Sequence, residues 1–363
     1  MSQPERILHI VNNMNKGGLE SRIMDIYRQI DRQKYQFDFY IESGEHGFYD
    51  DEIEYYGGKL YYNQSNHFMN IPRLFEFNQF LVSHSEEYRI VYSYNQWAGW
   101  YLKSAKKRGI AHRIAFSRTA VNSTSIRAIV KNLVKINAYK YATNCFAVSN
   151  KAGEWLFGKH EYMVWPNAID VKKYRFSPMI RETVRNEMGL IGKRVFIHVG
   201  NMRDAKNPEF LIELFTGIKA KYNNAVLLLC GSDSENLIAP LIEKHSINDS
   251  VIQLGNRDDI WRLLQAGDVF LFPSKYEGFP GAVLEAEASG LRCLISNTIT
   301  NEVIITNHIE ALPINEGISI WLDEIEKNPL YNREDDCDNV CKAGYDISEL
   351  VERTEAFFRS CIQ

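Results

Sequence analysis

RVFIHVGNMRDAKNPEFLIELFTGIKAKYNNAVLLLCG, residues 194–231, holds two apolar runs of strand length with a helical pattern between them. The first run is Val195–Val199, and the second is Val226–Leu229, which ends at Cys230-Gly231. The segment between them, Pro208–Lys221, is typical of a helix. A strand, a helix and a further strand in this order predict a parallel pair of strands joined by a crossover helix.

The same alternation continues on both sides of this stretch. Downstream, we expect helices at residues 237–244, 260–266 and 281–290, and strands at 251–254, 269–272 and 292–296. Upstream, we expect strands at 6–11, 37–41, 59–62, 90–94, 112–115 and 145–148, with a helix at 19–30. The series predicts an α/β fold of two Rossmann-like, doubly wound domains, each a parallel sheet covered on both faces.

The length of 363 residues agrees with two domains of about 150 residues each. We expect an N-terminal domain over residues 1–168, an interdomain linker over 169–193, a C-terminal domain over 194–345 and a final helix over 346–363. A hydrophobic content of 45% and a charged content of 24% exclude intrinsic disorder and collagen-like or disulfide-scaffold classes.

The net charge of −4 hides a strong asymmetry along the chain. Residues 101–160 contain twelve basic residues and one acidic residue, whereas residues 301–363 contain fourteen acidic and five basic residues. No apolar run reaches the roughly 18 residues of a membrane span, and no signal peptide is expected. The six scattered cysteines favour reduced thiols in a cytoplasmic protein over a metal site.

The most specific motif is KYEGFPGAVLEAE, residues 275–287, which follows the strand at 269–272 and opens a helix. Its Glu277 and Glu285 are separated by seven residues. Carboxylates suit the vicinal hydroxyls of a sugar and a ribose, and they repel phosphate. Glycines at 278 and 281 allow a ligand to approach the main chain. The competing interpretation is a surface turn and an amphipathic helix with solvated Glu285 and Glu287.

This motif resembles the E-x7-E signature of retaining glycosyltransferases of family 4, which have the GT-B fold with two domains facing a central cleft. The resemblance implies that Glu277 binds hydroxyls of the donor sugar and Glu285 the ribose of the nucleotide. It also implies that the main chain of the turn binds the sugar, through Gly278, Phe279, Pro280 and Gly281.

Residues 198–207 resemble the family segment G-R-x-x-x-x-K-N, in which Arg and Lys neutralise the donor diphosphate. Lys206 falls on the lysine, Asn201 takes the arginine position after Gly200, and Arg203 is the candidate replacement for that arginine. The resemblance further implies donor contacts at Gly17, Gly18, Gly231, Asn256 and Arg257, and an acceptor contact at Glu20.

One segment departs from the family. Residues 113–119, RIAFSRT, stand where the family commonly has R-I-A-H-S-H-N, so the two histidines become Phe116 and Arg118. Histidines at these positions often contact the reacting sugar or the acceptor. We therefore expect Arg118 to bind a phosphate of the acceptor instead.

The resemblance implies a retaining hexosyl- or N-acetylhexosaminyltransferase. The expected donor is a nucleotide-sugar, UDP-linked, and the expected acceptor is a lipid-linked or growing glycan of capsular or exopolysaccharide synthesis. No cofactor is expected because the nucleotide-sugar is a substrate, and the donor half lacks an Asp-x-Asp metal signature. In relatives the final helix crosses back to the first domain. The alternatives are a non-catalytic nucleotide-sugar-binding subunit of a glycosyltransferase complex and a nucleotide-sugar epimerase.

The segment Ser125–Tyr141 has apolar residues at helical spacing beside a basic row, Arg127, Lys131 and Lys135. Such a helix can lie on an anionic bilayer, which predicts peripheral attachment of the N-terminal domain to the inner face of the cell membrane. The alternative is a core-facing helix with a solvated basic edge. Nucleic acid is not an expected partner, because no nucleic-acid motif accompanies the charge.

Overall fold

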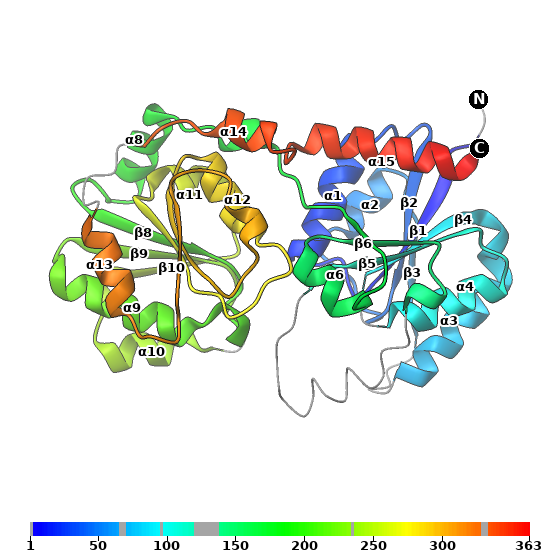
Figure 1. Cartoon of the computed structure of the whole chain (residues 1–363), viewed down its shortest axis with the longest axis horizontal. Coiled ribbons are helices and arrows are strands. Elements are labelled where there is room, and N and C mark those ends of the chain that lie inside the picture. Colours follow the sequence, from blue (N-terminus) through cyan, green and yellow to red (C-terminus); the bar gives the residue numbers. More distant parts are fainter. Residues whose placement is uncertain (1–2, 65–69, 95–96, 120–137, 234–235, 328–332) are drawn as a thin grey trace. The chain divides into compact units, whose positions relative to one another are not determined.

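The computed structural model describes residues 3–64, 70–94, 97–119, 138–233, 236–327 and 333–363. The chain divides into two compact units, shown in Figure 1. Unit 1 contains Met1–Ala168 and Ile347–Gln363, and unit 2 contains Ile169–Asp346.

Unit 1 is built on a sheet of seven parallel strands in the order β3-β2-β1-β4-β5-β6-β7. The strands are β1 (Glu5–Val11), β2 (Tyr35–Ile41), β3 (Leu60–Tyr62), β4 (Tyr88–Ser93), β5 (His112–Ser117), β6 (Asn144–Ala147) and β7 (Met163–Val164). The order reverses between β1 and β4, which is the switch point where doubly wound sheets bind ligands beyond the carboxyl ends of their strands.

The helices of unit 1 cover both faces of this sheet, with α1 and α15 on one face and α3 and α4 on the other (Figure 1). They are α1 (Gly18–Gln29), α2 (Asp50–Tyr55), α3 (Asn70–His84), α4 (Ala98–Lys107), α6 (Asn150–Phe157) and α15 (Ile347–Ile362), with 3-10 turns η1 (Ser85–Glu87) and η2 (Ala138–Lys140). Helix α15 packs the ring of Phe358 against Tyr35 and Phe37. The C-terminal helix is therefore part of the core of unit 1.

Unit 2 has six parallel strands in the order β10-β9-β8-β11-β12-β13, the same winding as the first sheet. The strands are β8 (Arg194–Val199), β9 (Ala225–Cys230), β10 (Val251–Gly255), β11 (Val269–Phe272), β12 (Arg292–Ser296) and β13 (Ile309–Leu312). Its switch point lies between β8 and β11, so the loops after these strands are where a ligand site is expected.

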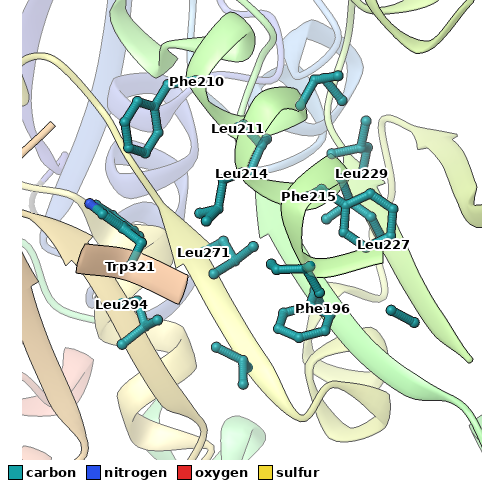
Figure 2. Close-up of a cluster of buried hydrophobic side chains, with 14 of the residues drawn as sticks. Phe196, Phe210, Leu211, Leu214, Phe215, Leu227, Leu229, Leu271, Leu294 and Trp321 are labelled. Atoms are coloured by element: carbon teal, nitrogen blue, oxygen red, sulfur yellow. The ribbon is translucent and has the colours of Figure 1, made fainter. Parts of the chain in front are cut away.

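Helices α9 and α13 cover one face of the second sheet around a large apolar cluster, drawn in Figure 2. Trp321 and Phe215 are fully buried there, and Phe196 of β8 joins them. The helices of unit 2 are α7 (Val171–Tyr174), α8 (Pro178–Glu187), α9 (Pro208–Lys221), α10 (Ile238–His245), α11 (Ile260–Ala266), α12 (Gly281–Ala288), α13 (Ser319–Lys327) and α14 (Cys337–Lys342), with 3-10 turns η3 (Asp204–Lys206), η4 (Asn248–Ser250) and η5 (Asn301–Val303). The cluster fixes the β8–α9 connection on which the candidate site depends.

Several elements have the bounds that the sequence predicts, among them α9, α11, β11 and β12. Residues 169–193, expected to be a linker, instead contain α7 and α8 and belong to unit 2. The physical reason is a set of polar contacts: Arg181 donates hydrogen bonds to the carbonyls of Gln265 and Gly267, at 2.9 and 2.6 Å, and pairs with Asp268. A polar sequence therefore conceals an integral part of the domain.

The basic helix expected at 125–141 falls almost wholly on residues 120–137, which lie outside the described residues together with Arg127, Lys131 and Lys135. None of the helices in the described ranges combines the length and the apolar composition that a membrane span requires.

Candidate functional site

The loops that follow β8, β9 and β10 converge at the carboxyl edge of the second sheet. The amide of Gly200 donates to the carbonyl of Cys230 at 2.8 Å, and the amide of Gly231 donates to the carbonyl of Gly255 at 2.8 Å. A Cβ atom on Gly231 would lie 2.1 Å from the carbonyl oxygen of Gly200, and Gly231 has φ of +140°. The predicted residues Gly200 and Gly231 therefore lie in close contact, and only glycine fits at position 231.

Asn201, in the family's arginine position, connects two of these loops. Its Oδ1 accepts hydrogen bonds from the amide and the hydroxyl of Ser232, at 3.2 and 3.0 Å. The amide of Met202 also donates to the carbonyl of Ser232 at 2.8 Å. The asparagine side chain thus braces the loop after β8 against the loop after β9, and it supplies no charge.

Lys206 and Glu277 form the central charged pair of the site. The Lys206 Nζ atom lies 2.5 Å from Oε1 of Glu277 and 4.4 Å from the centre of the Phe272 ring. Both side chains are largely buried, at 19% and 16% exposed. Because both groups are shielded from water, their attraction is stronger than that of an exposed pair.

A second set of contacts holds the two loops that carry this pair. The amide of Lys275, after β11, donates to the carbonyl of Ala205 in η3 at 2.8 Å. The Lys275 ammonium also lies 2.5 Å from a carboxylate oxygen of Asp204. The loops after β8 and β11 are therefore fixed to each other next to the central pair.

The two downstream acids of the motif are buried, which contradicts the interpretation of a solvated helix. Glu285 is 7% exposed and Glu287 is 1% exposed, both on α12. Oε1 of Glu287 accepts hydrogen bonds from the amides of Ile305 and Thr306 and from the Thr306 hydroxyl, at 3.0–3.1 Å. Burial raises the pKa of Glu287 to about 7. Glu287 therefore anchors a neighbouring loop, and of the two acids Glu285 remains the candidate ligand.

His198 is a residue of the site that sequence reasoning missed. Its Nδ1 donates to the carbonyl of Leu271 on β11 at 2.8 Å, and its ring lies 5.6 Å from the Phe272 ring. The fully buried Nε2 has no hydrogen-bond partner among the described residues. A Cβ on Gly200 would lie 3.4 Å from this Nε2 and 2.9 Å from Lys206 Cε, so the ring adjoins the central pair. Burial lowers the pKa of His198 to about 4, which keeps the ring neutral at pH 7.

Three predicted donor residues are exposed. Arg257 forms two hydrogen bonds with the carboxylate of Asp259, at 2.8 and 2.7 Å, and this pairing raises its pKa. Asn256 is exposed beside it. The Arg203 side chain is exposed, and within the described ranges it forms no hydrogen bond or ion pair, although the carbonyl of Arg203 accepts a hydrogen bond from the amide of Lys206 at 2.8 Å. No contact in the described residues joins the Arg203 guanidinium to the side chains of the Lys206–Glu277 pair.

The predicted turn residues Gly278, Phe279, Pro280 and Gly281 lie in unit 2 at the start of α12, where Phe279 is buried. Gly17, Gly18, Glu20 and Arg118 lie in unit 1, at the carboxyl edge of the first sheet. The Glu20 carboxylate folds back onto Gly17, because a Cβ there would meet Glu20 Oε2 at 2.3 Å, whereas a Cβ on Gly18 would meet nothing within 4 Å. Arg118 follows β5, and its guanidinium lies 5.0 Å from the centre of the Phe116 ring. No three His, Cys, Asp or Glu side chains in the described segments gather so that they could hold a metal ion.

Sequence comparisons identify relatives over most of the chain. Residues 181–329 match the family model for glycosyl transferases group 1. The glycosyltransferase EpsF of Bacillus subtilis is 28% identical over 96% of this chain and 95% of its own length. The capsular polysaccharide biosynthesis glycosyltransferase CapH of Staphylococcus aureus is 25% identical, over 82% of this chain and 83% of CapH. The UDP-Gal:alpha-D-GlcNAc-diphosphoundecaprenol alpha-1,3-galactosyltransferase of Escherichia coli is 28% identical, over 75% of this chain and 76% of that enzyme.

Structural comparison supports the same class. The crystal structure of Anabaena Alr3699/HepE in complex with UDP-glucose has a TM-score of 0.77 and 18% identity, over 98% of this chain and 99% of that chain. At that identity the likeness concerns the fold, two Rossmann-like parallel-sheet domains of the GT-B class. Residues 181–329 carry the match to the group 1 glycosyltransferases, and the chain as a whole resembles bacterial capsule and polysaccharide glycosyltransferases of family 4.

Proposed function

We propose that this protein is a retaining glycosyltransferase that moves a sugar from a UDP-sugar to a lipid-linked or growing polysaccharide. The Lys206–Glu277 contact carries the proposal. It brings a cation and a carboxylate to one point from two loops that are fixed to each other. A cation suits the diphosphate of a donor, and a carboxylate suits the hydroxyls of its sugar.

In the proposed reaction the bond between C1 of the sugar and the diphosphate oxygen breaks. A bond from C1 to an acceptor hydroxyl oxygen forms on the same face, and the hydroxyl proton passes to a phosphate oxygen of the departing UDP. Lys206 stabilises the negative charge on that diphosphate, while Glu277 orients the sugar and Glu285 the ribose. A cation that is already held in place, as Lys206 is, needs little reorganisation when the charge develops.

The donor base and the acceptor class are taken from the relatives. The E. coli relative has UDP-Gal as its donor and a GlcNAc-diphosphoundecaprenol as its acceptor. The Anabaena protein was crystallised with UDP-glucose. These names support UDP as the nucleotide and a diphosphate-linked glycan as the acceptor.

A lipid-linked acceptor agrees with peripheral attachment to an anionic membrane surface, which we also propose for the segment 125–141. Its support is the charge pattern of the sequence, because the segment lies outside the described residues. Co-sedimentation with vesicles that contain phosphatidylglycerol tests the attachment. Retention at low salt and release at high salt are expected, whereas failure to be retained at low salt contradicts it.

The second candidate is a non-catalytic nucleotide-sugar-binding subunit that acts with a partner glycosyltransferase. It is favoured by Asn201, which hydrogen-bonds Ser232 and supplies no charge, and by Arg203, which is exposed. In this candidate, the positive charge that faces the donor diphosphate comes from Lys206, which is paired with Glu277.

The two candidates are separated by measuring donor binding and turnover on the same preparation. UDP-glucose, UDP-galactose and their N-acetylhexosamine analogues are offered with a decyl-diphosphate-linked N-acetylglucosamine as acceptor, and release of UDP is followed. We expect wild type to release UDP and Glu277→Ala to lose most of this activity, with exposed Glu243→Ala as the matched control. Binding of a UDP-sugar without release of UDP on any acceptor favours the non-catalytic subunit.

A further inference from the structure

Arg118 differs from Arg6 and Arg113, two other partly buried arginines of unit 1, in having no polar partner among the described residues. Arg6 pairs with Asp38, and Arg113 donates hydrogen bonds to the carbonyls of Tyr141 and Ala111, at 2.7 and 2.8 Å. In the described part of the chain, the Arg118 guanidinium makes no hydrogen bond and no ion pair. The guanidinium lies over the face of Phe116, 5.0 Å from the ring centre.

The surroundings of Arg118 are aromatic and poorly solvated. The Phe116 ring lies 5.7 Å from the Tyr94 ring, and the Tyr94 hydroxyl is bonded to Nδ1 of buried His9 at 2.7 Å. Arg118 is partly buried, and this burial lowers its pKa to about 10, so the guanidinium stays charged at pH 7. A desolvated charge without a counter-ion is costly, and a ligand of opposite charge removes that cost.

The nearby charges do not neutralise it. Arg22 acts on Arg118 as a second positive charge, and Glu20 acts on it as a negative charge. Arg22 is itself bonded to Asp25 at 2.9 Å and to the carbonyl of Ala168 at 3.2 Å. Glu20 does not reach Arg118, since no ion pair within 4 Å joins them in the described residues. Arg118 therefore has no directly paired carboxylate among the described residues.

The position of Arg118 in the fold is that of a ligand-binding residue. It follows β5, whose partner β4 forms one side of the switch point, and Tyr94 directly follows β4. Glu20 and Arg22 belong to the helix α1 that begins just after β1. All three strands end at the carboxyl edge of the sheet, where doubly wound folds bind ligands.

We infer that Arg118, over Phe116 and beside Arg22, forms a subsite for an anionic group of the acceptor. The inference rests on the proposed function, since it describes the acceptor of that reaction. The planar guanidinium can donate two parallel hydrogen bonds to the oxygens of a phosphate or a carboxylate. The group is either a phosphate of a lipid carrier or the carboxylate of an acidic sugar.

Calorimetric binding to the full chain, with saturating UDP present to occupy the donor site, tests the subsite. The probes are decyl-diphosphate-linked N-acetylglucosamine, the neutral decyl N-acetylglucosaminide and decyl glucuronide. We expect wild type to bind one of the two anionic probes at least tenfold more tightly than the neutral one. Preference for the diphosphate assigns the lipid carrier, and preference for the glucuronide assigns an acidic sugar.

In Arg118→Gln the preference for the anionic probe should fall by about 10- to 100-fold, which is the size expected for a charge-assisted hydrogen bond pair. Arg118→Lys keeps the positive charge but loses the two parallel N–H donors of the guanidinium. Its preference for the anionic probe should therefore lie between those of wild type and Arg118→Gln. Arg89→Gln is the matched control, because Arg89 is exposed at the opposite end of β4. A thermal melt checks that each variant is folded.

Two results overturn the inference: wild type that binds the anionic probes no more tightly than the neutral probe, and Arg118→Gln that keeps the preference of wild type. Failure of the proposed function is recognised separately. In that case UDP-sugars neither bind to wild type nor are turned over, whatever the anionic probes do.

Discussion

The carboxyl edges of the two sheets each present a partly buried cation, but the two charges are balanced differently. In unit 2, Lys206 lies 2.5 Å from Glu277. In unit 1, Arg118 lies over an aromatic ring with no carboxylate at contact distance among the described residues. Apart from the additional edge strand β7 of the first sheet, the two sheets have the same winding, so topology explains where the cations lie and the loop sequences explain how they are neutralised. A site with its own counter-ion is held in shape without ligand, whereas an unbalanced charge is completed by one.

The first strands of the two sheets extend this comparison, because each carries a buried histidine. Nδ1 of His9 is bonded to the Tyr94 hydroxyl and Nδ1 of His198 to the Leu271 carbonyl, while Nε2 of each has no partner among the described residues. The His9 ring is surrounded by the rings of aromatic residues, whereas His198 adjoins Lys206. The histidine on the first strand thus belongs to an aromatic core in unit 1 and to the charged site in unit 2.

The largest expected effect comes from removing the balanced cation. Lys206→Ala should lower kcat for UDP release by about 10²- to 10³-fold, because the departing diphosphate loses a fixed positive charge. Lys244→Ala, an exposed lysine on α10, should leave kcat unchanged. A loss of less than threefold in Lys206→Ala would show that the paired cation of unit 2 does not act on the donor.

The second test compares glycines at the two edges. Gly231→Ala should lower the free energy of unfolding of unit 2 by about 2–3 kcal/mol, since the new Cβ would lie 2.1 Å from a main-chain oxygen at a strained φ. Gly18→Ala has open space around the new Cβ and should change the stability of unit 1 by less than about 1 kcal/mol. Hydrogen exchange followed by mass spectrometry reports each unit separately. Equal effects would refute the difference in packing.

The smallest expected effect distinguishes the two histidines by pH. The pKa of His9 is lowered to about 3 and that of His198 to about 4, both by burial. In the unfolded chain the two imidazole rings bind protons near pH 6.5, whereas in the folded chain they stay neutral at that pH. Each ring therefore stabilises the fold above pH 6.5, and about 2 kcal/mol of that stability is lost on going from pH 7.5 to pH 5.

His9→Gln and His198→Gln should each flatten this acid-induced loss in their own unit, as measured by hydrogen exchange at several pH values. Below pH 4 the loss should continue in unit 1 and level off in unit 2, because His198 begins to gain its proton there. A stability of either unit that does not change between pH 7.5 and pH 5 would argue against a neutral buried histidine in that unit.

Local patterns were sufficient to predict many elements. The bounds of α9 and β11 follow from apolar residues at helical and strand spacing, and these residues form the cluster of Figure 2. The segment 198–207 also identified Lys206, and the motif 275–287 identified Glu277. The structure joins these two side chains. Their roles toward a donor, and that of Arg118 toward an acceptor, remain predictions.

Other features could not be read from local patterns. Arg181 looks like a solvated linker residue, yet it bonds the carbonyls at the end of α11, about 85 positions further along the chain. His198 is one polar residue in an apolar strand, and its importance depends on Gly200 and Lys206 lying beside it. Glu287 looks like a surface acid, but the amides that bind it come from the loop at 305–306.

The sequence by itself determined the alternation of strands and helices, the winding of two parallel sheets and the acids and cations of the motifs, because each depends on residues close together in the chain. Only the tertiary structure decided that Lys206 contacts Glu277 across 71 positions, that Glu285 and Glu287 are buried, and that Arg118 lacks a counter-ion among the described residues. Such contacts join the ends of strands that are neighbours in the sheet and far apart in the chain. Charge balance and burial therefore follow from packing and cannot be obtained from local sequence.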